Sequence, residues 1–429
     1  MKKLFLLSIF IIISLFGANL HFKLYKKDGK IPGNRLLVIG GIHGNEPGGY
    51  FAPAMLILHY KIKKGSLWIV PNLNFDSDIR DVRGFYGDMN RKFAKIDKND
   101  PDYNIVQDIK KIILDPRVDL ILNLHDGHGY YRRYWENSIF NPKAWGQACI
   151  IDQKCIDSKK FGDLDSIAKK VANEVNKKLI KNHHIFNIKN TKTKFHDEQM
   201  QKSLTYFAIT HGKPAFAIET SKNIKDLSQK VYYQLIAIET FMKVMGIEFE
   251  RDFKLNVPTI KKLLKDYGYA VINGNIKLDL NHIKRYLYYF PLNKNSNSIE
   301  GSHPLLAFLK DKNRWNIMVG NIKVTTLIPD YVKSKKCIDS IDMVIDSKEK
   351  KIKVPSIVDV KNSFLVKKSD SFRINVIGFT KKGIKNESGI LIKRGDILKR
   401  FSLDKDNKMY RVEIYKKDSF CGMVVVNFK

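Results

Sequence analysis

Residues that can bind a metal ion stand three positions apart near the start of this chain. His43 and Glu46 lie in the segment 40–46 (GGIHGNE), directly after the apolar run 36–39. A catalytic zinc site uses three nitrogen, oxygen or sulfur ligands and keeps one position open for water. The pair therefore predicts two ligands of a hydrolytic zinc site. By itself it is also typical of a turn histidine followed by a glutamate at a helix N-terminus.

Two later apolar runs, 118–124 and 215–218, are each followed at once by a further candidate, His125 and Glu219. Sites in open α/β sheets form beyond the carboxyl ends of the strands, so these side chains are expected beside the first pair. We predict His125 as the third zinc ligand. Glu219 is the predicted general base, which deprotonates a water molecule and later protonates the leaving amine. His128 is the alternative ligand, but it lies farther from the strand end, in a glycine loop.

A polar loop between these segments carries candidate substrate ligands. Arg83, Asn90 and Arg91 lie in the stretch 81–91, after the strand-like run 67–70. Arginine binds carboxylates through two hydrogen bonds, and a guanidinium beside a zinc ion stabilises a developing oxyanion. The loop predicts recognition of an anionic substrate; without the metal site it would be a solvated basic loop.

The pattern of strands and helices predicts how these residues are positioned. Strand-like runs alternate with helical patterns up to about residue 248, which favours a largely parallel sheet covered by helices on both faces. Residues 251–338 mix a short helix with strands, and alternation dominates 339–429, which is typical of a small β-sandwich. The predicted layout is a signal peptide at 1–18, an α/β domain at 19–250, a small mixed β-rich domain at 251–338 and a sandwich-like domain at 339–429.

The first residues resemble a targeting segment. Lys2 and Lys3 precede an apolar stretch at 4–16, and Gly17 and Ala18 supply small residues for cleavage. This pattern predicts export with removal of the signal peptide, and an uncleaved anchor is the alternative. No later segment is apolar enough to span a membrane.

The formal net charge of +32 favours anionic surfaces. Export separates the protein from nucleic acid, so we expect no nucleic-acid partner. We therefore interpret the excess of lysine and arginine as a solvated basic surface with a weak attraction to the anionic cell wall.

Four cysteines do not make a dense disulfide framework. Cys149 and Cys155 are close enough in sequence to pair in an oxidising compartment, and the paired short spacings of a cysteine zinc site are absent. His183 and His184 lie in a polar stretch, and we expect both to be surface or loop residues.

The order His-Gly-Asn-Glu, Asn-Arg, strand-end His and strand-end Glu resembles the carboxypeptidase A-type zinc peptidases. Within that family, the whole chain with its trailing domains most resembles the peptidoglycan DL-carboxypeptidases that determine the shape of helical bacteria. The resemblance implies a carboxypeptidase-like fold, one zinc ion and a periplasmic location. It also implies a reaction that removes meso-diaminopimelate from muramyl tripeptide and leaves a dipeptide, which trims the wall and influences cell shape.

The resemblance also implies roles for single residues. His43, Glu46 and His125 match the zinc ligands, and Glu219 matches the catalytic glutamate. Some of these wall enzymes carry glutamine at the position of His43, so metal affinity is expected to differ. Arg83 matches the arginine that polarises the scissile carbonyl.

The remaining matches concern substrate binding. Asn90 and Arg91 match the pair that grips the terminal carboxylate. The tyrosine acid of the family has no clear match; Tyr206, thirteen residues before the predicted base, is the candidate. Trp145 and Thr205 are expected to line the pocket.

Two other functions stay open at this point. The segment 40–46 also resembles N-acyl amino acid deacylases such as aspartoacylase and succinylglutamate desuccinylase, although export and two trailing domains argue against them. A non-catalytic wall-binding scaffold is the second alternative, against which the complete set of site residues argues. The C-terminal domains could bind glycan, lipoprotein or proteins of cell-shape control and wall synthesis, or act as spacers.

Overall fold

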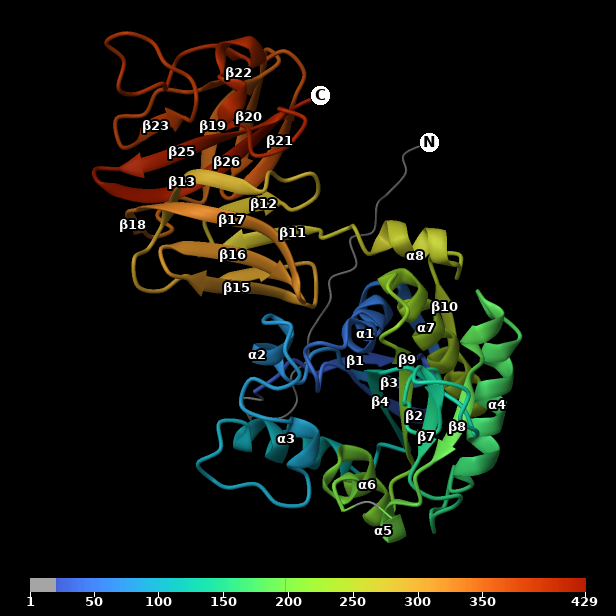
Figure 1. Ribbon diagram of the computed structural model, residues 1–429. Coiled ribbons are helices and arrows are strands. Elements are labelled where there is room, and N and C mark those ends of the chain that lie inside the picture. Colours follow the sequence, from blue (N-terminus) through green and yellow to red (C-terminus); the bar gives the residue numbers. More distant parts are fainter. Residues whose placement is uncertain (1–20, 197) are drawn as a thin grey trace.

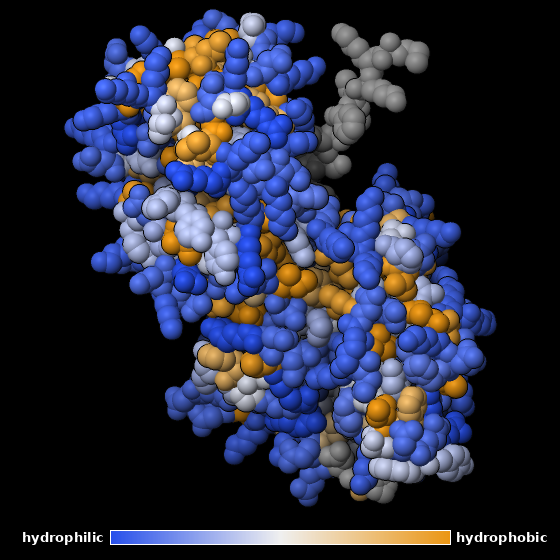
Figure 2. Space-filling model, turned by 45° about the horizontal axis from the view of Figure 1, so that its top comes forward, coloured by the Kyte–Doolittle hydropathy of each residue, from blue (hydrophilic) through white to orange (hydrophobic). Residues whose placement is uncertain are grey.

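The computed structural model describes residues 21–196 and 198–429, so the predicted signal peptide lies outside the described residues. Two lobes make up the molecule (Figure 1). Hydrophilic residues cover most of the face shown in Figure 2, and apolar residues gather between the lobes. None of the described helices is both long and apolar enough to cross a membrane.

An eight-stranded sheet forms the core of the N-terminal lobe, with the order β1-β3-β2-β4-β9-β7-β8 and β10 paired to β3. Strands β3, β2, β4 and β9 run parallel to one another, and β1 and β10 pair antiparallel to β3. Strand β7 is antiparallel to β9 and parallel to β8. The bounds are β1 Tyr25–Asp28, β2 Ile31–Ile39, β3 Tyr60–Val70, β4 Leu120–Gly127, β7 Ala148–Ile151, β8 Asn187–Asn190, β9 Ala215–Ser221 and β10 Glu248–Arg251. This mixed, mostly parallel sheet confirms the predicted fold class.

Helices cover both faces of this sheet, with α1, α7 and α4 on one side and α3 and α6 on the other (Figure 1). Every residue of β4 and β9 is buried as a result, which explains why these strands are mostly apolar and do not alternate with polar residues. The helices are α1 Pro47–His59, α2 Phe75–Asp78, α3 Tyr103–Ile113, α4 Leu164–Asn176, α5 Thr193–His196, α6 Leu204–Thr210, α7 Leu227–Val244 and α8 Val257–Leu263; short 3₁₀ turns include η1 Met89–Arg91, η2 Asn182–His184 and η3 Met200–Lys202.

The second lobe is built from four small sheets. Two of them lie nearer the first lobe: β12-β11-β14 (Ile276–Asp279, Tyr269–Ile272, Ile299–Gly301) and β13-β17-β16-β15 (Tyr286–Leu292, Ile322–Tyr331, Arg314–Val319, Leu306–Asp311). The other two are β18-β26-β25-β23 with β21 (Lys333–Ser334, Ser419–Phe428, Met409–Lys416, Arg373–Val376, Ser356–Val360) and β20-β19-β22-β24 (Lys348–Lys353, Ser340–Ile345, Ser363–Val366, Ile392–Lys393).

Strand β26 contributes to two hydrophobic cores at once. Val424 and Val426 pack into the sandwich-like core of the C-terminal sheets, whereas Met423 and Val425 pack into the core formed with β11 to β17. Alternate residues of a strand face opposite sides, so one apolar strand joins both cores. The predicted boundaries at 250/251 and 338/339 stay predictions.

The disulfide of the protein joins Cys337 to Cys421, across 84 residues of sequence. Cys149 and Cys155 are both free, so the pairing that their spacing leaves open does not form. Cys149 is buried in β7. Cys155 is exposed, and its backbone forms an isolated antiparallel β-bridge with Asp163. Parallel pairing of β18 with β26 brings the two distant cysteines together, which spacing in the sequence does not reveal.

The two lobes touch beside α1. Gly320, at the turn between β16 and β17, has a φ of +56°, and a Cβ there would lie 2.8 Å from the Tyr50 ring. Asn321 donates a hydrogen bond from Nδ2 to Asp81 Oδ1 at 3.1 Å. Ile79 packs against Met318 in a small apolar cluster. The second lobe therefore contacts the helix that follows Glu46 and the segment that leads to Arg83.

His184, expected as a surface or loop residue, lies in the short turn η2 and is not at the surface, since only 2% of it is exposed. Its Nδ1 lies 3.0 Å from the Tyr233 hydroxyl, and its ring stacks on Tyr130. Burial, with smaller contributions from the nearby His183 and Lys181 charges, lowers the pKa of His184 to about 4.

Stability is expected to fall in acid partly through this histidine. The unfolded chain binds a proton at His184 below about pH 6.5, while the folded chain binds it only near pH 4, so the free energy of unfolding falls between these values. Between pH 8 and pH 5, the melting temperature measured by scanning calorimetry should fall further for the wild type than for His184→Gln. The exposed His282 supplies a control, since His282→Gln should behave like the wild type; equal losses in all three proteins would contradict the expectation.

Candidate metal centre and active site

Strand register brings the predicted site residues to one edge of the sheet. His125 and Glu219 are direct partners across β4 and β9, and Ile39 at the end of β2 pairs with Asn123. The segment 40–46 leaves β2 at this same edge. Three parts of the chain far apart in sequence therefore meet beyond the carboxyl ends of parallel strands.

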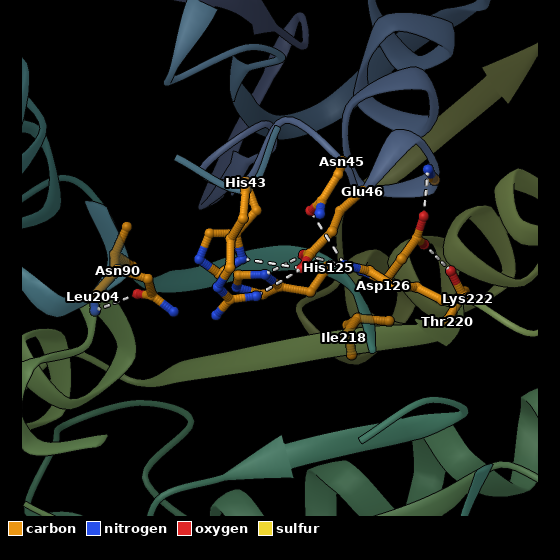
Figure 3. Close-up of polar contacts among 12 residues, drawn as sticks. His43, Asn45, Glu46, Asn90, His125, Asp126, Leu204, Ile218, Thr220 and Lys222 are labelled. Atoms are coloured by element: carbon orange, nitrogen blue, oxygen red, sulfur yellow. Dashed lines mark hydrogen bonds and ion pairs between the residues drawn. The ribbon is translucent and has the colours of Figure 1, made fainter. Parts of the chain in front are cut away.

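The side chains of His43, Glu46 and His125 converge in this place (Figure 3). Their potential ligand atoms all lie within 4.8 Å of one another, and all three residues are buried. Glu46 Oε1 lies 3.1 Å from His43 Nδ1, and Oε2 lies 2.8 Å from His125 Nδ1. Two imidazole nitrogens and a carboxylate with free space beside them suit a divalent transition metal.

Close backbone packing holds the segment 40–46 in this position. Gly41 has a φ of +67°, and a Cβ there would lie 2.4 Å from Asp78 Oδ2. Gly48, in the first turn of α1, comes equally close to Asp126. These close approaches require glycine and set the direction in which Glu46 leaves the turn.

Asp126 accepts hydrogen bonds from α1 and α7 beside the metal group. Its Oδ2 accepts hydrogen bonds from Gly48 N at 2.9 Å and from Lys230 Nζ at 3.1 Å, and Oδ1 accepts from the Thr220 hydroxyl. The side chain turns away from the histidines (Figure 3). It therefore joins the start of α1, the end of β9 and α7 next to the metal ligands.

Asp88 supports His43 from the other side. His43 Nε2 lies 2.8 Å from Asp88 Oδ1, which also accepts the hydrogen bond from Asn90 N. A carboxylate on the second ring nitrogen fixes the orientation and tautomer of a metal-ligating histidine. Arg83 donates to Asp88 Oδ2 at 3.0 Å and to Glu46 Oε1 at 3.3 Å, so one arginine touches both carboxylates.

The electrostatics of Glu46 and His125 suit ligands that bind a metal, whereas the carboxylates of Glu46 and Asp88 raise the pKa of His43 although burial opposes them. Burial would raise the pKa of Glu46, but His43 and His125 around it hold this pKa well below its usual range. Burial lowers the pKa of His125, which keeps its imidazole neutral. An ionised carboxylate and a neutral imidazole are the forms that coordinate metal ions. The residues present therefore fit the implied metal.

Glu219 differs from Glu46 in its surroundings. It is 9% exposed, and within the described residues its Oε2 has no hydrogen-bond partner. Burial, and then the charges of Glu46 and Asp126, raise its pKa well above that of a free glutamate. A desolvated carboxylate with a raised pKa beside a metal site has the properties of a general base near neutral pH.

A cavity of about 280 Å³ joins these groups. The predicted residues Arg83, Asn90, Arg91, Trp145 and Thr205 all line it with the metal group and Glu219. Tyr206 is not among the lining residues; it lies on α6, partly buried against the core. Because the helix turns by 100° per residue, the position next to a cavity residue faces elsewhere.

Asn90 and Arg91 are held in place by the first residue of α6 and by the turn η3 before it. Asn90 Oδ1 accepts a hydrogen bond from Leu204 N at 3.0 Å (Figure 3). Arg91 donates to the Asn90 carbonyl and contacts Met200 Sδ at 3.6 Å. The amide and the guanidinium are thereby fixed side by side along the cavity wall.

Sequence reasoning missed several residues of this site. Asp88, Asp126 and Lys222 stand near glycines or strand ends, but nothing in their spacing distinguishes them from loop or surface charges. Lys222 Nζ lies 3.2 Å from Glu46 Oε1, and Asn123 lines the cavity from β4. His128 also lines the cavity but is exposed, outside the metal group.

Fold and site together define a metallo-carboxypeptidase. Residues 1–265 match peptidase family M99, described as the catalytic part of a carboxypeptidase controlling helical cell shape, and residues 334–429 match a C-terminal domain of metallo-carboxypeptidases. The chain belongs to this family of cell-shape carboxypeptidases, as the resemblance predicted.

Solved structures of one relative match almost the whole chain. The apo form of the cell shape determinant Csd4 from Helicobacter pylori is 38% identical, covers 95% of this chain and 100% of its own, and has a TM-score of 0.92. The tripeptide-bound form is 38% identical, covers 95% of this chain and 100% of its own, and has a TM-score of 0.91. The mDAP-bound form, described as a D,L-carboxypeptidase, is 39% identical, covers 94% of this chain and 100% of its own, and has a TM-score of 0.91. A search of curated proteins gives no match.

Asp88→Asn is expected to weaken metal binding. An amide supports the imidazole of His43 less well than a carboxylate, and loss of such a partner costs about 10- to 100-fold in metal affinity. Titration against a competing chelator measures the change. Asp76→Asn is the matched control, because Asp76 pairs with Arg80 and does not contact the site. An unchanged affinity in Asp88→Asn would show that the contact with His43 does not support the metal.

Proposed function

We propose that this metallo-carboxypeptidase holds one zinc ion and removes the terminal meso-diaminopimelate from muramyl tripeptide, leaving a dipeptide. The observation that carries the proposal is the buried carboxylate of Glu219, whose Oε2 has no hydrogen-bond partner in the described part of the chain and which shares one cavity with the group of His43, Glu46 and His125. The relative's tripeptide-bound and mDAP-bound structures support this choice of substrate.

Zinc is the metal that best suits the donor set. Two histidine nitrogens and one glutamate oxygen are the ligands of many hydrolytic zinc sites. Zinc bound there would supply positive charge that polarises a carbonyl and acidifies a water molecule. Every other requirement of the reaction falls to the side chains of this protein.

Substrate positioning falls to the arginine-bearing loop. The Arg91 guanidinium and the Asn90 amide are placed to hold the terminal carboxylate of the peptide, since both line the cavity on the same wall. Arg83, which contacts Glu46, lies beside the metal group, where its charge stabilises oxygen as negative charge develops on the scissile carbonyl. Trp145 and Thr205 complete the pocket.

Glu219 moves the proton. Its carboxylate takes a proton from the water molecule whose oxygen attacks the scissile carbonyl carbon, and it then gives the proton to the leaving amine as the carbon–nitrogen bond breaks. The products are a new carboxylate on the dipeptide and a free amino acid. The raised pKa of Glu219 suits both steps, because the group must accept and release a proton near neutral pH.

Export to the periplasm belongs to the same proposal. The basic, apolar and small-residue pattern at 1–18 supports it, and a wall peptide is accessible only outside the cytoplasm. Family membership favours this carboxypeptidase over an acyl amino acid deacylase, and the complete set of cavity residues argues against an inert scaffold.

The direct test is release of diaminopimelate from muramyl tripeptide by the purified protein, followed by mass spectrometry. Glu219→Gln should lower kcat by about 10²- to 10⁴-fold while zinc content stays at one ion per chain, because only the base is lost. Glu248→Gln, on the edge strand β10, is the matched control. Cleavage of N-acetylaspartate or succinylglutamate instead of the peptide would replace the proposed function.

Metal removal tests the zinc assignment. A chelator should abolish the activity, and zinc should restore it. His43→Gln should bind zinc roughly tenfold more weakly, since an amide oxygen is a poorer zinc ligand than imidazole. His59→Gln, a change at the far end of α1, should match the wild type. Better reactivation by another divalent ion would refute the choice of zinc.

A further inference from the structure

A loop at the rim of the cavity exposes two aromatic side chains. Tyr134 is 82% exposed and Trp135 is 62% exposed. Both lie between β5 (Tyr130–Tyr131) and β6 (Phe140–Asn141), a two-stranded parallel pair that branches from the end of β4. We call residues 132–139 the rim loop.

The rim loop is continuous with the cavity wall. The residues that flank it, His128 and Trp145, both line the cavity, and Trp145 N donates a hydrogen bond to the His128 carbonyl at 2.9 Å. Tyr131 packs in one apolar cluster with Ile150 and Ala217, which also line the cavity. Residues next to the rim loop therefore contact residues that line the cavity.

A lysine joins the rim to the cavity. Lys189 Nζ lies 4.0 Å from the centre of the Trp145 ring and 5.1 Å from that of Tyr131, and it donates to the Ala144 carbonyl at 2.9 Å. Tyr131 and Trp145 are thus clamped by one cation, with Tyr134 three residues farther along.

The frame of the rim loop is rigid and independent of its exposed rings. Arg132 donates from Nη2 to the His183 carbonyl at 2.7 Å, and its guanidinium lies over the Phe140 ring at 5.1 Å. Asn137 and Asn141 close the loop with hydrogen bonds to its backbone. A preformed loop loses little conformational entropy when it binds a ligand.

Neither exposed ring contributes to this frame. Across residues 21–196 and 198–429, Tyr134 and Trp135 make no hydrogen bond, ring contact or cation contact with another side chain. Large exposed aromatic rings outside the packing of a fold are typical of binding surfaces. Substituting them should therefore leave the fold and the cavity intact.

The chemistry of the rim loop suits a polar ligand with flat apolar faces. Glu136 Oε1 lies 3.5 Å from Arg132 Nε in an ion pair, Arg133 directly precedes Tyr134, and Asn137 adds an amide. A sugar ring can place its C–H face on an aromatic ring and its hydroxyls on such polar neighbours. The stem peptide of the proposed substrate is attached to such sugars.

We propose that Tyr134 and Trp135 bind the sugar rings that carry the stem peptide while the peptide occupies the cavity. The inference rests on the proposed function and adds to it the part of the substrate that is recognised outside the cavity. The enzyme then prefers glycan-linked tripeptide over free tripeptide.

The test compares two substrates that share one peptide. The holoenzyme is assayed for release of diaminopimelate from free tripeptide and from the disaccharide-linked tripeptide. The variant carrying both Tyr134→Ala and Trp135→Ala should lose about tenfold in kcat/KM on the disaccharide substrate, the sum of two modest ring contacts, and stay within about twofold of wild type on free tripeptide. Tyr288→Ala, at an exposed tyrosine of β13, is the matched control and should change neither value.

The outcomes separate the two claims. Equal wild-type rates on both substrates, no effect of the double variant, or equal losses on both would overturn the sugar contact while diaminopimelate release upholds the proposed function. Cleavage of neither substrate by the wild type would overturn both. A double variant that changes oligomeric state, measured by light scattering, with equal rates on both substrates would instead assign the rim loop to contact between copies of the chain.

Discussion

The carboxylate of Glu46 is the point on which the rest of the site depends. It is 4% exposed and lies within hydrogen-bond distance of both histidines of the metal group. Arg83 and Lys222 add positive charge to the same carboxylate. A buried charge is tolerated only when it is paired, so these partners form a group in which removal of any member changes the others. Glu219, the direct partner of His125 on the neighbouring strand, stays outside this pairing and keeps a raised pKa.

This arrangement needs a support that holds four segments of chain together. Asp126, adjacent to His125, accepts hydrogen bonds from the start of α1, from β9 and from α7. Asp88 does the same for His43 and the arginine loop. Carboxylates with two or three donors each fix side-chain orientation far better than apolar contact, which has no direction. The metal ligands are thus oriented by neighbours that do not themselves belong to the metal group.

The second lobe contacts the segments that lead to and from the site. The turn at Gly320 packs on Tyr50 of α1, and Asn321 contacts Asp81, two residues before Arg83. Strand β26 in turn joins the two cores of that lobe, and the disulfide at Cys421 ties the same strand to the residues after β18. The lobes therefore form a connected structure in which the trailing sheets support the wall of the cavity. The rim loop follows β5 beside the cavity and exposes Tyr134 and Trp135 to solvent.

The sequence by itself determined the α/β fold and the edge of the sheet at which the site lies. An apolar run indicates a buried strand, and a His or Glu directly after it lies at the carboxyl end of that strand. It also placed the cavity residues Arg83, Asn90 and Trp145. Only the tertiary structure decided the support by Asp88 and Asp126, the position of Tyr206 away from the cavity and the pairing of Cys337 with Cys421. Local patterns record whether a residue is buried, but contacts between distant segments depend on strand register and on packing, which no short stretch of sequence contains.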